Sequence, residues 1–353
     1  MDEIKQDISQ NYNMQPYKHG GDIYRNHVDL DFSVNVNPFG MPEEVKIALH
    51  GAVEEAVKYP DIMAERLKDG VSAMLSVPRE YLLFGNGASE LFMALIHGLK
   101  PKKTVIPVPS FYGYEYAAKA IEGELVYYPL KEENSFLPSK DFFEVLSEDI
   151  NLLFLANPNN PTGTLIKKEA LIELLSFCKK RGIWVVLDEC FIEFCGKVDT
   201  MVSEIERFPN LILVRAFTKI FAIPGVRLGY LICSNLPLIE KIKRQLPEWN
   251  LSVFAHAAGC ACIGQREWIA KTVEDIKRER RFLTEQLMQK GIQVFPSEAN
   301  FLLVYSERPL YKELLAHGIL IRDCENFRGL KRGYYRIAVR SRKENEVLLE
   351  AFV

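Results

Sequence analysis

One lysine follows a strongly apolar run, at the start of a loop that contains Pro and Gly. The run is Leu211-Ile212-Leu213-Val214, and the lysine is Lys219. A lysine at the end of a buried strand loses solvation, which lowers the pKa of its amine and makes it a usable nucleophile for a carbonyl carbon. Arg227, further along the same loop, could hold an anion beside that amine. Taken alone, the pair is more often an ordinary lysine and arginine of a surface loop, so the rest of the sequence must decide.

Three other polar groups also follow apolar runs that have the character of strands. The turn at 85–90, Gly-Asn-Gly-Ala-Ser-Glu, precedes an apolar helix, so its backbone N–H groups and the helix dipole could bind a phosphate. A tight turn with a capped helix explains the same residues equally well. Asn-Pro-Asn-Asn-Pro-Thr-Gly at 157–163 and Asp188 each end a wholly apolar run. Because ligands of open α/β sheets bind where strand ends meet loops, we expect these groups to share a site with Lys219.

The elements that must position these residues alternate between strand and helix. Apolar runs separated by amphipathic segments predict a mostly parallel sheet between helices, an α/β fold. The expected strands are 81–84, 104–108, 124–128, 151–156, 183–187 and 211–214, and the expected helices are 42–57, 64–76, 91–99, 114–122, 141–146 and 169–181.

The regular alternation of strands and helices stops near Pro247, and it is also missing before residue 41. Long helices at 255–263 and 268–290, strands at 301–304, 319–321 and 335–339, and a final helix from Glu344 predict a smaller α+β unit. The segment 31–38 alternates like a short strand and is stopped by Pro38.

Composition restricts the class of protein. The chain has 353 residues and a net charge of −3, without a polybasic run, so a nucleic-acid partner is not indicated. No apolar run has membrane-spanning length and the first residues lack the apolar core of a signal peptide, so we expect a cytoplasmic protein without a membrane partner. Seven cysteines without a CxxC pair predict reduced thiols. Cys260-Ala261-Cys262 is only a weak indication of metal binding, and no metal is expected.

The polar groups together match the needs of one cofactor. An amine, a phosphate cradle, a carboxylate for a ring nitrogen and an amide for a ring oxygen are what pyridoxal 5′-phosphate (PLP) requires. The motifs Asn-Pro-x-Asn-Pro-Thr-Gly (157–163), Asp-Glu-x-Phe (188–191) and Thr-Lys…Gly-x-Arg-Leu-Gly-Tyr (218–230) resemble the fold-type-I PLP enzymes, in the branch of the histidinol-phosphate aminotransferases. Within that branch the sequence is most similar to the decarboxylases of L-threonine O-3-phosphate in cobalamin biosynthesis. The segments that carry this narrower resemblance are 19–21, 31–38, 221–225, 247–249, 319–324 and 334–341.

The resemblance implies a domain organisation and a homodimer. It implies an N-terminal arm (1–40) that contributes to the small domain and the active site, a large PLP-binding domain (41–246) and a small C-terminal α+β domain (247–353). The partner subunit would contribute Tyr59 to the active site.

The resemblance also implies a role for each matching residue. Lys219 would bind the cofactor covalently and act with Asp188 in catalysis. Asp188 would pair with the ring nitrogen, Asn160 with the ring hydroxyl, and Phe111 would stack on the ring. Gly87, Ala88, Thr218 and Arg227 would hold the cofactor phosphate together with Tyr59; Arg336 would bind the substrate carboxylate, and His19, Asn35 and Arg322 would surround the substrate and its phosphate. Without the resemblance, His19 reads as part of an exposed arm, and both Arg322 and Arg336 read as exposed charges at strand ends.

Two positions depart from the aminotransferase pattern. Phe191 stands where those enzymes usually carry tyrosine, and the decarboxylases tolerate phenylalanine there. Ala216 replaces a serine that usually binds the cofactor phosphate, and one lost hydrogen bond weakens binding by on the order of 1 kcal/mol. The reaction expected is decarboxylation of a small phosphorylated amino acid, L-threonine O-3-phosphate or L-serine O-phosphate. The alternatives are an aminotransferase of the histidinol-phosphate type and a non-catalytic regulatory protein with this fold.

Overall fold

A large, mostly parallel sheet forms the centre of the molecule. The computed structural model describes residues 19–196 and 200–352, and in that part of the chain seven strands are ordered β2-β8-β7-β6-β5-β3-β4. Only β8 runs antiparallel to its two neighbours among these seven described strands. The strands are β2 (Leu82–Gly85), β3 (Lys103–Val108), β4 (Glu124–Pro129), β5 (Leu152–Ala156), β6 (Trp184–Asp188), β7 (Leu211–Ala216) and β8 (Gly229–Ile232).

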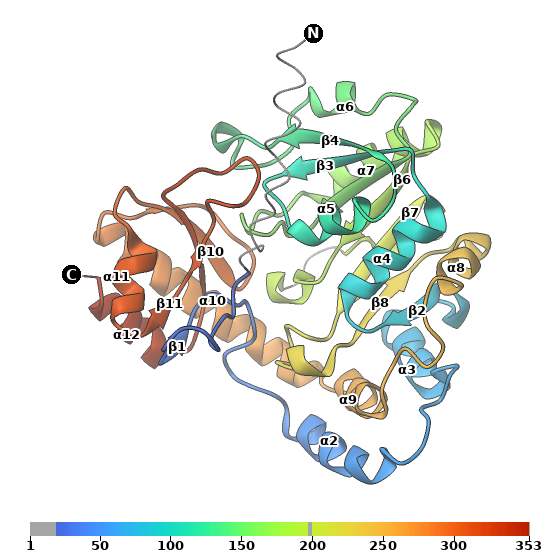
Figure 1. Ribbon diagram of the computed structural model, residues 1–353, viewed down its shortest axis with the longest axis horizontal. Helices are drawn as coiled ribbons and strands as arrows, with labels where there is room; N and C mark the ends of the chain where they lie inside the picture. Colours follow the sequence, from blue (N-terminus) through green and yellow to red (C-terminus); the bar gives the residue numbers. More distant parts are fainter. Residues whose placement is uncertain (1–18, 197–199, 353) are drawn as a thin grey trace.

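Helices cover both faces of this sheet, as the largely apolar sequences of its central strands require. Figure 1 shows α4 and α5 in front of the sheet and α7 behind it. The helices of this part are α2 (Glu43–Glu55), α3 (Glu65–Leu75), α4 (Ala88–Leu99), α5 (Tyr112–Ala118), α6 (Phe142–Val145), α7 (Lys168–Lys180), α8 (Leu236–Lys243) and α9 (Val253–Ile263), with short 3₁₀ helices at Arg79–Tyr81, Glu132–Asn134, Ile192–Cys195, Met201–Glu204 and Pro224–Val226.

A second, smaller sheet lies beside the first, with the long helix α10 next to it (Figure 1). It is antiparallel in the order β12-β13-β10-β9, and a separate parallel pair joins β1 to β11. The chain therefore ends its pairing with β1 at Leu320 and, after Ile321, begins its pairing with β13 at Arg322. The elements are β1 (Leu30–Asp31), α10 (Arg266–Gln289), β9 (Gln293–Val294), β10 (Phe301–Tyr305), α11 (Leu310–Ala316), β11 (Ile319–Leu320), β12 (Arg322–Asp323), β13 (Tyr334–Ala338) and α12 (Arg342–Glu350).

The expected α/β fold with a second sheet is confirmed, and one expected strand is wrong for most of its length. In the expected strand 31–38, only Asp31 pairs as a strand, together with Leu30 before it. The carboxylate of Asp31 accepts bonds from the backbone N–H and the hydroxyl of Ser33, and Asn37 accepts a bond from the N–H of Phe39. Such local side-chain bonds compete with a strand ladder, so alternation alone misled here. The expected helix 114–122 is also displaced, because α5 spans Tyr112–Ala118.

The domain boundaries at 40/41 and 246/247 stay a prediction. β1, from the N-terminal segment, pairs with β11 of the smaller unit, whereas α9 packs against α2 and α3. Residues 1–18 of the predicted arm lie outside the described residues. None of the helices described has both the length and the apolar character needed to cross a membrane.

Strand pairing explains how distant segments meet at one edge of the large sheet. The loop 217–228 connects β7 to β8, whose first residue Gly229 pairs with Ala216 on one side and with Gly85 on the other. The turn after β2 therefore lies beside the loop that carries Lys219. Asp188, at the end of β6, pairs with Ala156, at the end of β5. All the polar groups that the sequence placed after strands thus face one edge.

Candidate active site

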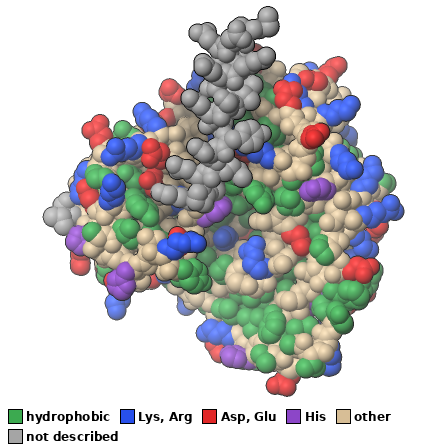
Figure 2. Space-filling model, in the orientation of Figure 1, with side chains coloured by type: hydrophobic (Ala, Val, Ile, Leu, Met, Phe, Trp, Pro, Cys, Tyr) green, Lys and Arg blue, Asp and Glu red, His purple; other side chains and the backbone are tan. Residues whose placement is uncertain are grey.

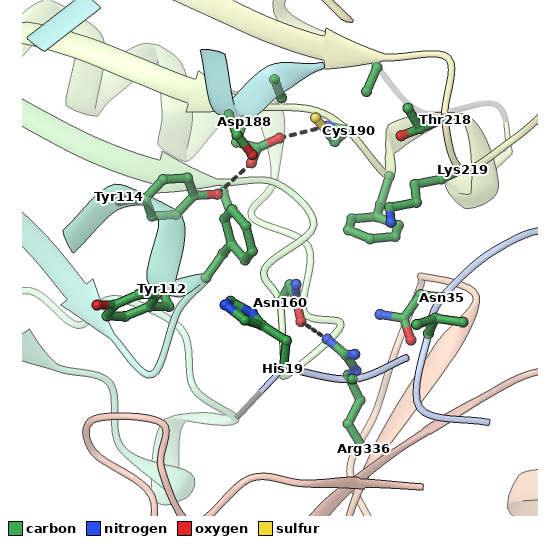
Figure 3. A pocket seen from close by; sticks show the side chains of 18 of the residues that line it. His19, Asn35, Tyr112, Tyr114, Asn160, Asp188, Cys190, Thr218, Lys219 and Arg336 are labelled. Carbon is green, nitrogen blue, oxygen red and sulfur yellow. Dashed lines mark hydrogen bonds between the residues drawn. The ribbon is translucent and has the colours of Figure 1, made fainter. Parts of the chain in front are cut away.

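A cavity of about 240 Å³ opens at this edge, between the two sheets. Its walls come from the ends of β5, β6 and β7, from the N-terminal segment and from the small sheet (Figure 3). Side chains of the predicted site that line it are His19, Asn35, Ala88, Phe111, Asn160, Asp188, Thr218, Lys219, Arg227, Arg322 and Arg336. Residues more than 300 positions apart in the chain therefore share one cavity.

Lys219 supplies a reactive amine to this cavity. Its side chain points into the space that Asn35 approaches from the N-terminal segment and Arg336 from the small sheet (Figure 3). Burial lowers the pKa of the amine to about 8, and the charges of Arg336 and Arg227 act in the same direction. The backbone is held in place because the carbonyl of Lys219 accepts a bond from the N–H of Asn37. Near neutral pH an appreciable share of this amine is therefore neutral and nucleophilic.

An arginine side chain and two glycines meet where α4 begins. The guanidinium of Arg227 approaches Gly87 so closely that a Cβ atom on Gly87 would lie 2.4 Å from Nη2. The same applies to Gly229, where a Cβ would lie 2.8 Å from the backbone nitrogen of Ala88. The two glycines thus let an arginine and a helix N-terminus converge, which is an arrangement that binds phosphate. Thr218 lines the same cavity with a buried side chain.

Asp188 places a buried carboxylate on the opposite wall. Its Oδ2 accepts a bond of 2.6 Å from the hydroxyl of Tyr114, and its Oδ1 accepts a bond of 2.9 Å from the backbone N–H of Cys190. Burial raises the pKa of this carboxyl, and these two donors oppose the rise. A cation that enters the cavity, such as a protonated pyridine nitrogen, would compensate this carboxylate.

Asn160 and Arg336 form one bonded pair across the boundary between the sheets. Arg336 donates through Nη1 to the side-chain oxygen of Asn160, and through Nη2 to the carbonyl oxygen of Ser33 at 2.7 Å. Since the oxygen of Asn160 is engaged, its amide NH₂ stays directed as a donor for a ligand oxygen. The Nε of Arg336 is buried and has no hydrogen-bond partner among the described residues, as is the case for Oδ1 of Asn35. Both atoms are therefore available to bond a ligand.

Two buried arginines lie directly opposite each other at the small-sheet side of the cavity. Arg322 of β12 pairs in register with Arg336 of β13. Arg322 also donates to the carbonyl of Asp323 and to the side chain of Asn326, each at 2.8 Å. Burial lowers the pKa of Arg336 to about 10, and Arg322 contributes to that shift. The pKa of His19 is lowered by burial and then by Arg322. Figure 2 shows cationic and histidine side chains around a hollow near the centre of this face.

The structure differs from the predicted site at two positions. Gly87 does not itself line the cavity. Ala88, which follows it in the chain, and Arg227, whose guanidinium lies against it, do line the cavity. Tyr59 follows α2, does not line the cavity, is 82% exposed, and its ring lies 5.0 Å from that of Trp249. Its expected role across a dimer interface therefore stays a prediction.

Sequence reasoning missed several residues that line the cavity. They are Gly20, Ser33, Val34, Ser89, Phe92, Tyr112, Tyr114, Ala156, Pro158, Cys190 and Phe327. A signal existed for Tyr114, because it follows Phe111 by three residues at the start of a helix and so lies on the same face. Phe191 and Ala216 also line the cavity, so the two departures noted in the sequence do lie in the site. Among the described residues no cluster of three His, Cys, Asp or Glu side chains could hold a metal ion.

The fold and this set of residues define a PLP-dependent enzyme of fold type I. Comparison with known proteins agrees: the model of the aminotransferase class I and II family matches residues 28–352, and the chain belongs to that family. Threonine-phosphate decarboxylase of Salmonella typhimurium is 35% identical over 91% of this chain and 90% of its own length. A putative threonine-phosphate decarboxylase of Caldanaerobacter subterraneus is 39% identical over 96% and 94%. The solved structure of histidinol-phosphate aminotransferase from Clostridium acetobutylicum is 34% identical, with a TM-score of 0.87 over 92% of this chain and 98% of that one.

The residues present fit PLP. The solved histidinol-phosphate aminotransferase of Sinorhizobium meliloti, which contains PLP, has the same fold, with a TM-score of 0.83 at 21% identity over 96% of this chain and 94% of that one. In the present chain the fit rests on the space that Gly87 leaves for Arg227, on the buried carboxylate of Asp188 and on the amine of Lys219. The phosphate of PLP would lie beside Gly87 and Arg227, its ring nitrogen would pair with Asp188, and its carbonyl carbon would react with Lys219.

The lowered pKa of Lys219 predicts an unusually reactive amine. In the apoenzyme at pH 8, about half of this amine should be neutral, against less than ~1% for a lysine at its ordinary pKa. We expect its acetylation by acetic anhydride, followed by mass spectrometry, to increase with pH around a midpoint near 8. Exposed lysines of the same digest provide the reference. A midpoint near 10.5, the ordinary value, would contradict the desolvated site.

Proposed function

We propose that the enzyme decarboxylates L-threonine O-3-phosphate, or its close analogue L-serine O-phosphate, to an amino-alcohol phosphate used in corrinoid synthesis. Relatives with the first of these activities in their names align with nearly the whole chain. A bifunctional adenosylcobalamin biosynthesis protein of Leptospira interrogans is 34% identical over 92% of this chain, which supports the link to corrinoids. The chain covers only 38% of that protein, so the rest of it has no counterpart here.

The pairing of Arg322 with Arg336 is the observation that carries this proposal. Like charges directly opposite in a sheet repel, and burial increases the cost. Anions between or beside the two guanidinium groups would remove that cost. A phosphorylated amino acid brings two anionic groups, a carboxylate for Arg336 and a phosphate for Arg322 with His19. The unpartnered Nε of Arg336 supports the first of these contacts.

Holding both anionic groups of the substrate determines which bond reacts. Bound PLP supplies an electron sink for a bond at Cα, provided that this bond stands perpendicular to the cofactor ring. With carboxylate and phosphate both fixed, Arg322 and Arg336 can hold the Cα–carboxylate bond in that direction. Asp188 keeps the ring nitrogen protonated. After CO₂ has left, Lys219 is the group whose Nζ can return a proton to Cα.

The alternative is transamination of the histidinol-phosphate type. The close likeness to the aminotransferase from Clostridium acetobutylicum favours it, and so does a histidinol-phosphate aminotransferase of Carboxydothermus hydrogenoformans that is 31% identical over 89% of this chain and 90% of its own length. In that reaction the Cα–H bond would stand perpendicular to the ring, and Lys219 would move the proton. Phe191 favours decarboxylation mildly, since it lacks the tyrosine hydroxyl usual in those aminotransferases.

A substrate comparison tests the reaction. We expect the holoenzyme to release CO₂ from L-threonine O-3-phosphate, and more slowly from L-serine O-phosphate, because one methyl group in a pocket is worth roughly 1–3 kcal/mol. The measurement is ¹⁴CO₂ release from carboxyl-labelled substrate, with glutamate formation from 2-oxoglutarate and histidinol phosphate assayed in parallel. Lys219→Ala is the inactive control. Amino transfer without CO₂ release would establish the alternative. If the holoenzyme catalysed neither reaction, that result would favour a non-catalytic protein.

Replacing Arg322 tests the phosphate site. We expect Arg322→Met to lower kcat/KM for L-threonine O-3-phosphate about 10- to 100-fold, mainly through KM, because a charge-assisted bond to phosphate is lost. Turnover of unphosphorylated L-threonine, however slow, should stay within about twofold of the wild type. Arg308→Met, which removes an exposed ion pair with Glu313 outside the cavity, is the matched control. Equal losses with both substrates would exclude Arg322 from phosphate binding.

A homodimer also belongs to this proposal. Around α2, the loop that follows it and the segment before α9, an apolar patch is exposed, formed by Ile47, Val53, Val57, Tyr59, Ile62, Met63 and Trp249. Figure 2 shows hydrophobic side chains gathered over this lower part of the face. Contiguous exposed apolar surface marks an interaction site, and a second copy of the chain would cover it. Tyr59 belongs to this patch, so in such a dimer its side chain could reach the partner's cofactor phosphate.

Mixed dimers test whether Tyr59 acts across the interface. Tyr59→Ala and Lys219→Ala are each expected to have low activity. If the two variants are unfolded and refolded together, half of the dimers are mixed and hold one intact site, so about a quarter of wild-type activity should return. Refolding each variant alone is the control. No recovery in a mixture that forms dimers by light scattering would place Tyr59 in its own subunit's site, or outside any site.

A further inference from the structure

Tyr114 is a deeply buried polar side chain beside the cavity, and its hydroxyl has no part in the proposed reaction so far. It is 1% exposed and lies on α5, one helical turn after Phe111. Figure 3 shows its hydroxyl directed at Asp188 on the wall of the cavity. The bond between them is 2.6 Å long, which is typical of a charge-assisted bond from a hydroxyl to a carboxylate.

The ring of Tyr114 cannot turn away from this bond. It stacks on Phe154 with 5.1 Å between centroids and 8° between planes. Phe92 and Phe111 meet it edge to face, at 5.1 and 5.6 Å. Phenylalanine would satisfy all of these ring contacts, so packing alone does not explain a hydroxyl here. A hydroxyl buried at this place requires an acceptor, and Asp188 is that acceptor.

The carboxylate of Asp188 is held on both oxygens. The backbone N–H of Cys190 donates to Oδ1 and Tyr114 donates to Oδ2, so each oxygen keeps a lone pair for a group in the cavity. Burial and the nearby charge of Asp188 raise the pKa of Tyr114 well above its ordinary value, so the hydroxyl stays protonated and can only be the donor.

We propose that Tyr114 is a positioning residue for the cofactor: its hydroxyl keeps the carboxylate of Asp188 charged and aimed at the ring nitrogen of PLP. This inference rests on the proposed pairing of Asp188 with that nitrogen, and it holds for decarboxylation and for transamination alike. Because the hydroxyl acts through Asp188, its loss should weaken only those properties that need the ring nitrogen. The start of α5 would then fix both the face of the ring, through Phe111 at its N-cap, and the ring nitrogen, through Tyr114.

The test compares two cofactors on apoenzyme. We measure the dissociation constants of PLP and of 1-deaza-PLP, in which carbon replaces the ring nitrogen, for the wild type and Tyr114→Phe. The variant should bind PLP about tenfold more weakly, because one bond to a charged group is lost. It should bind 1-deaza-PLP within about twofold of the wild type, since that ring offers Asp188 no N–H. With PLP, kcat should fall while KM for the substrate changes little.

A matched variant separates this effect from loss of a buried hydroxyl in general. Tyr128, on β4 and outside the cavity, is also buried and donates to a carboxylate, that of Asp141, at 2.7 Å. Tyr128→Phe should leave both dissociation constants unchanged. If Tyr114→Phe weakens both cofactors equally, or neither, the inference is overturned. If Asp188→Asn fails to weaken PLP relative to 1-deaza-PLP, the pairing of Asp188 with the ring is overturned and the inference with it. Neither result depends on which reaction the enzyme catalyses.

Discussion

The structure depends on an excess of positive charge around one cavity, where Arg322 and Arg336 are buried. Its lining includes Lys219 and Arg227 from the large sheet and both Arg322 and Arg336 from the small one, whereas Asp188 is the only acid among the described lining residues. Burial lowers the pKa of Lys219 to about 8 and that of Arg336 to about 10, so the folded protein already disfavours these charges. Burying like charges together costs free energy unless anions join them. The fold therefore prepares a place for ligands that bring several negative charges.

Backbone pairing holds these cations at fixed positions. Because β8 returns between β7 and β2, the loop with Lys219 and the turn with Gly87 lie at the same edge of the sheet. Arg322 and Arg336 face each other because the chain changes partners between β11 and β12. The bond from Arg336 to Asn160 then joins the small sheet to the large one. In the proposed site, a substrate anion at Arg336 is thereby coupled to the cofactor ring that Asn160 would contact.

Sequence reasoning succeeded where a local pattern determines the structure. The apolar runs of β5, β6 and β7, with polar residues at or just after their ends, predicted both the parallel sheet and the edge where ligands bind. It failed at 31–38, where bonds from the side chain of Asp31 replace the strand. The cross-strand register of Arg322 and Arg336 could not be predicted, because it depends on the change of partner within five residues. The bond from Tyr114 to Asp188 joins residues 74 positions apart and has no sequence signature.

Phe191 and Ala216, the two departures from the aminotransferase pattern, make cofactor binding depend more on Asp188. Phe191 packs its ring edge to face against Phe301, 5.2 Å between centroids, and offers no hydroxyl to a ring oxygen. Ala216 offers none to a phosphate. Each absent hydroxyl removes on the order of 1 kcal/mol of cofactor binding relative to enzymes that have it. The remaining contacts must therefore retain PLP, and among them the ion pair with Asp188 loses most if its carboxylate is poorly aimed. When two hydroxyl contacts to the cofactor are absent, cofactor binding depends more on Asp188, and the proposed bond from Tyr114 that holds this carboxylate matters more.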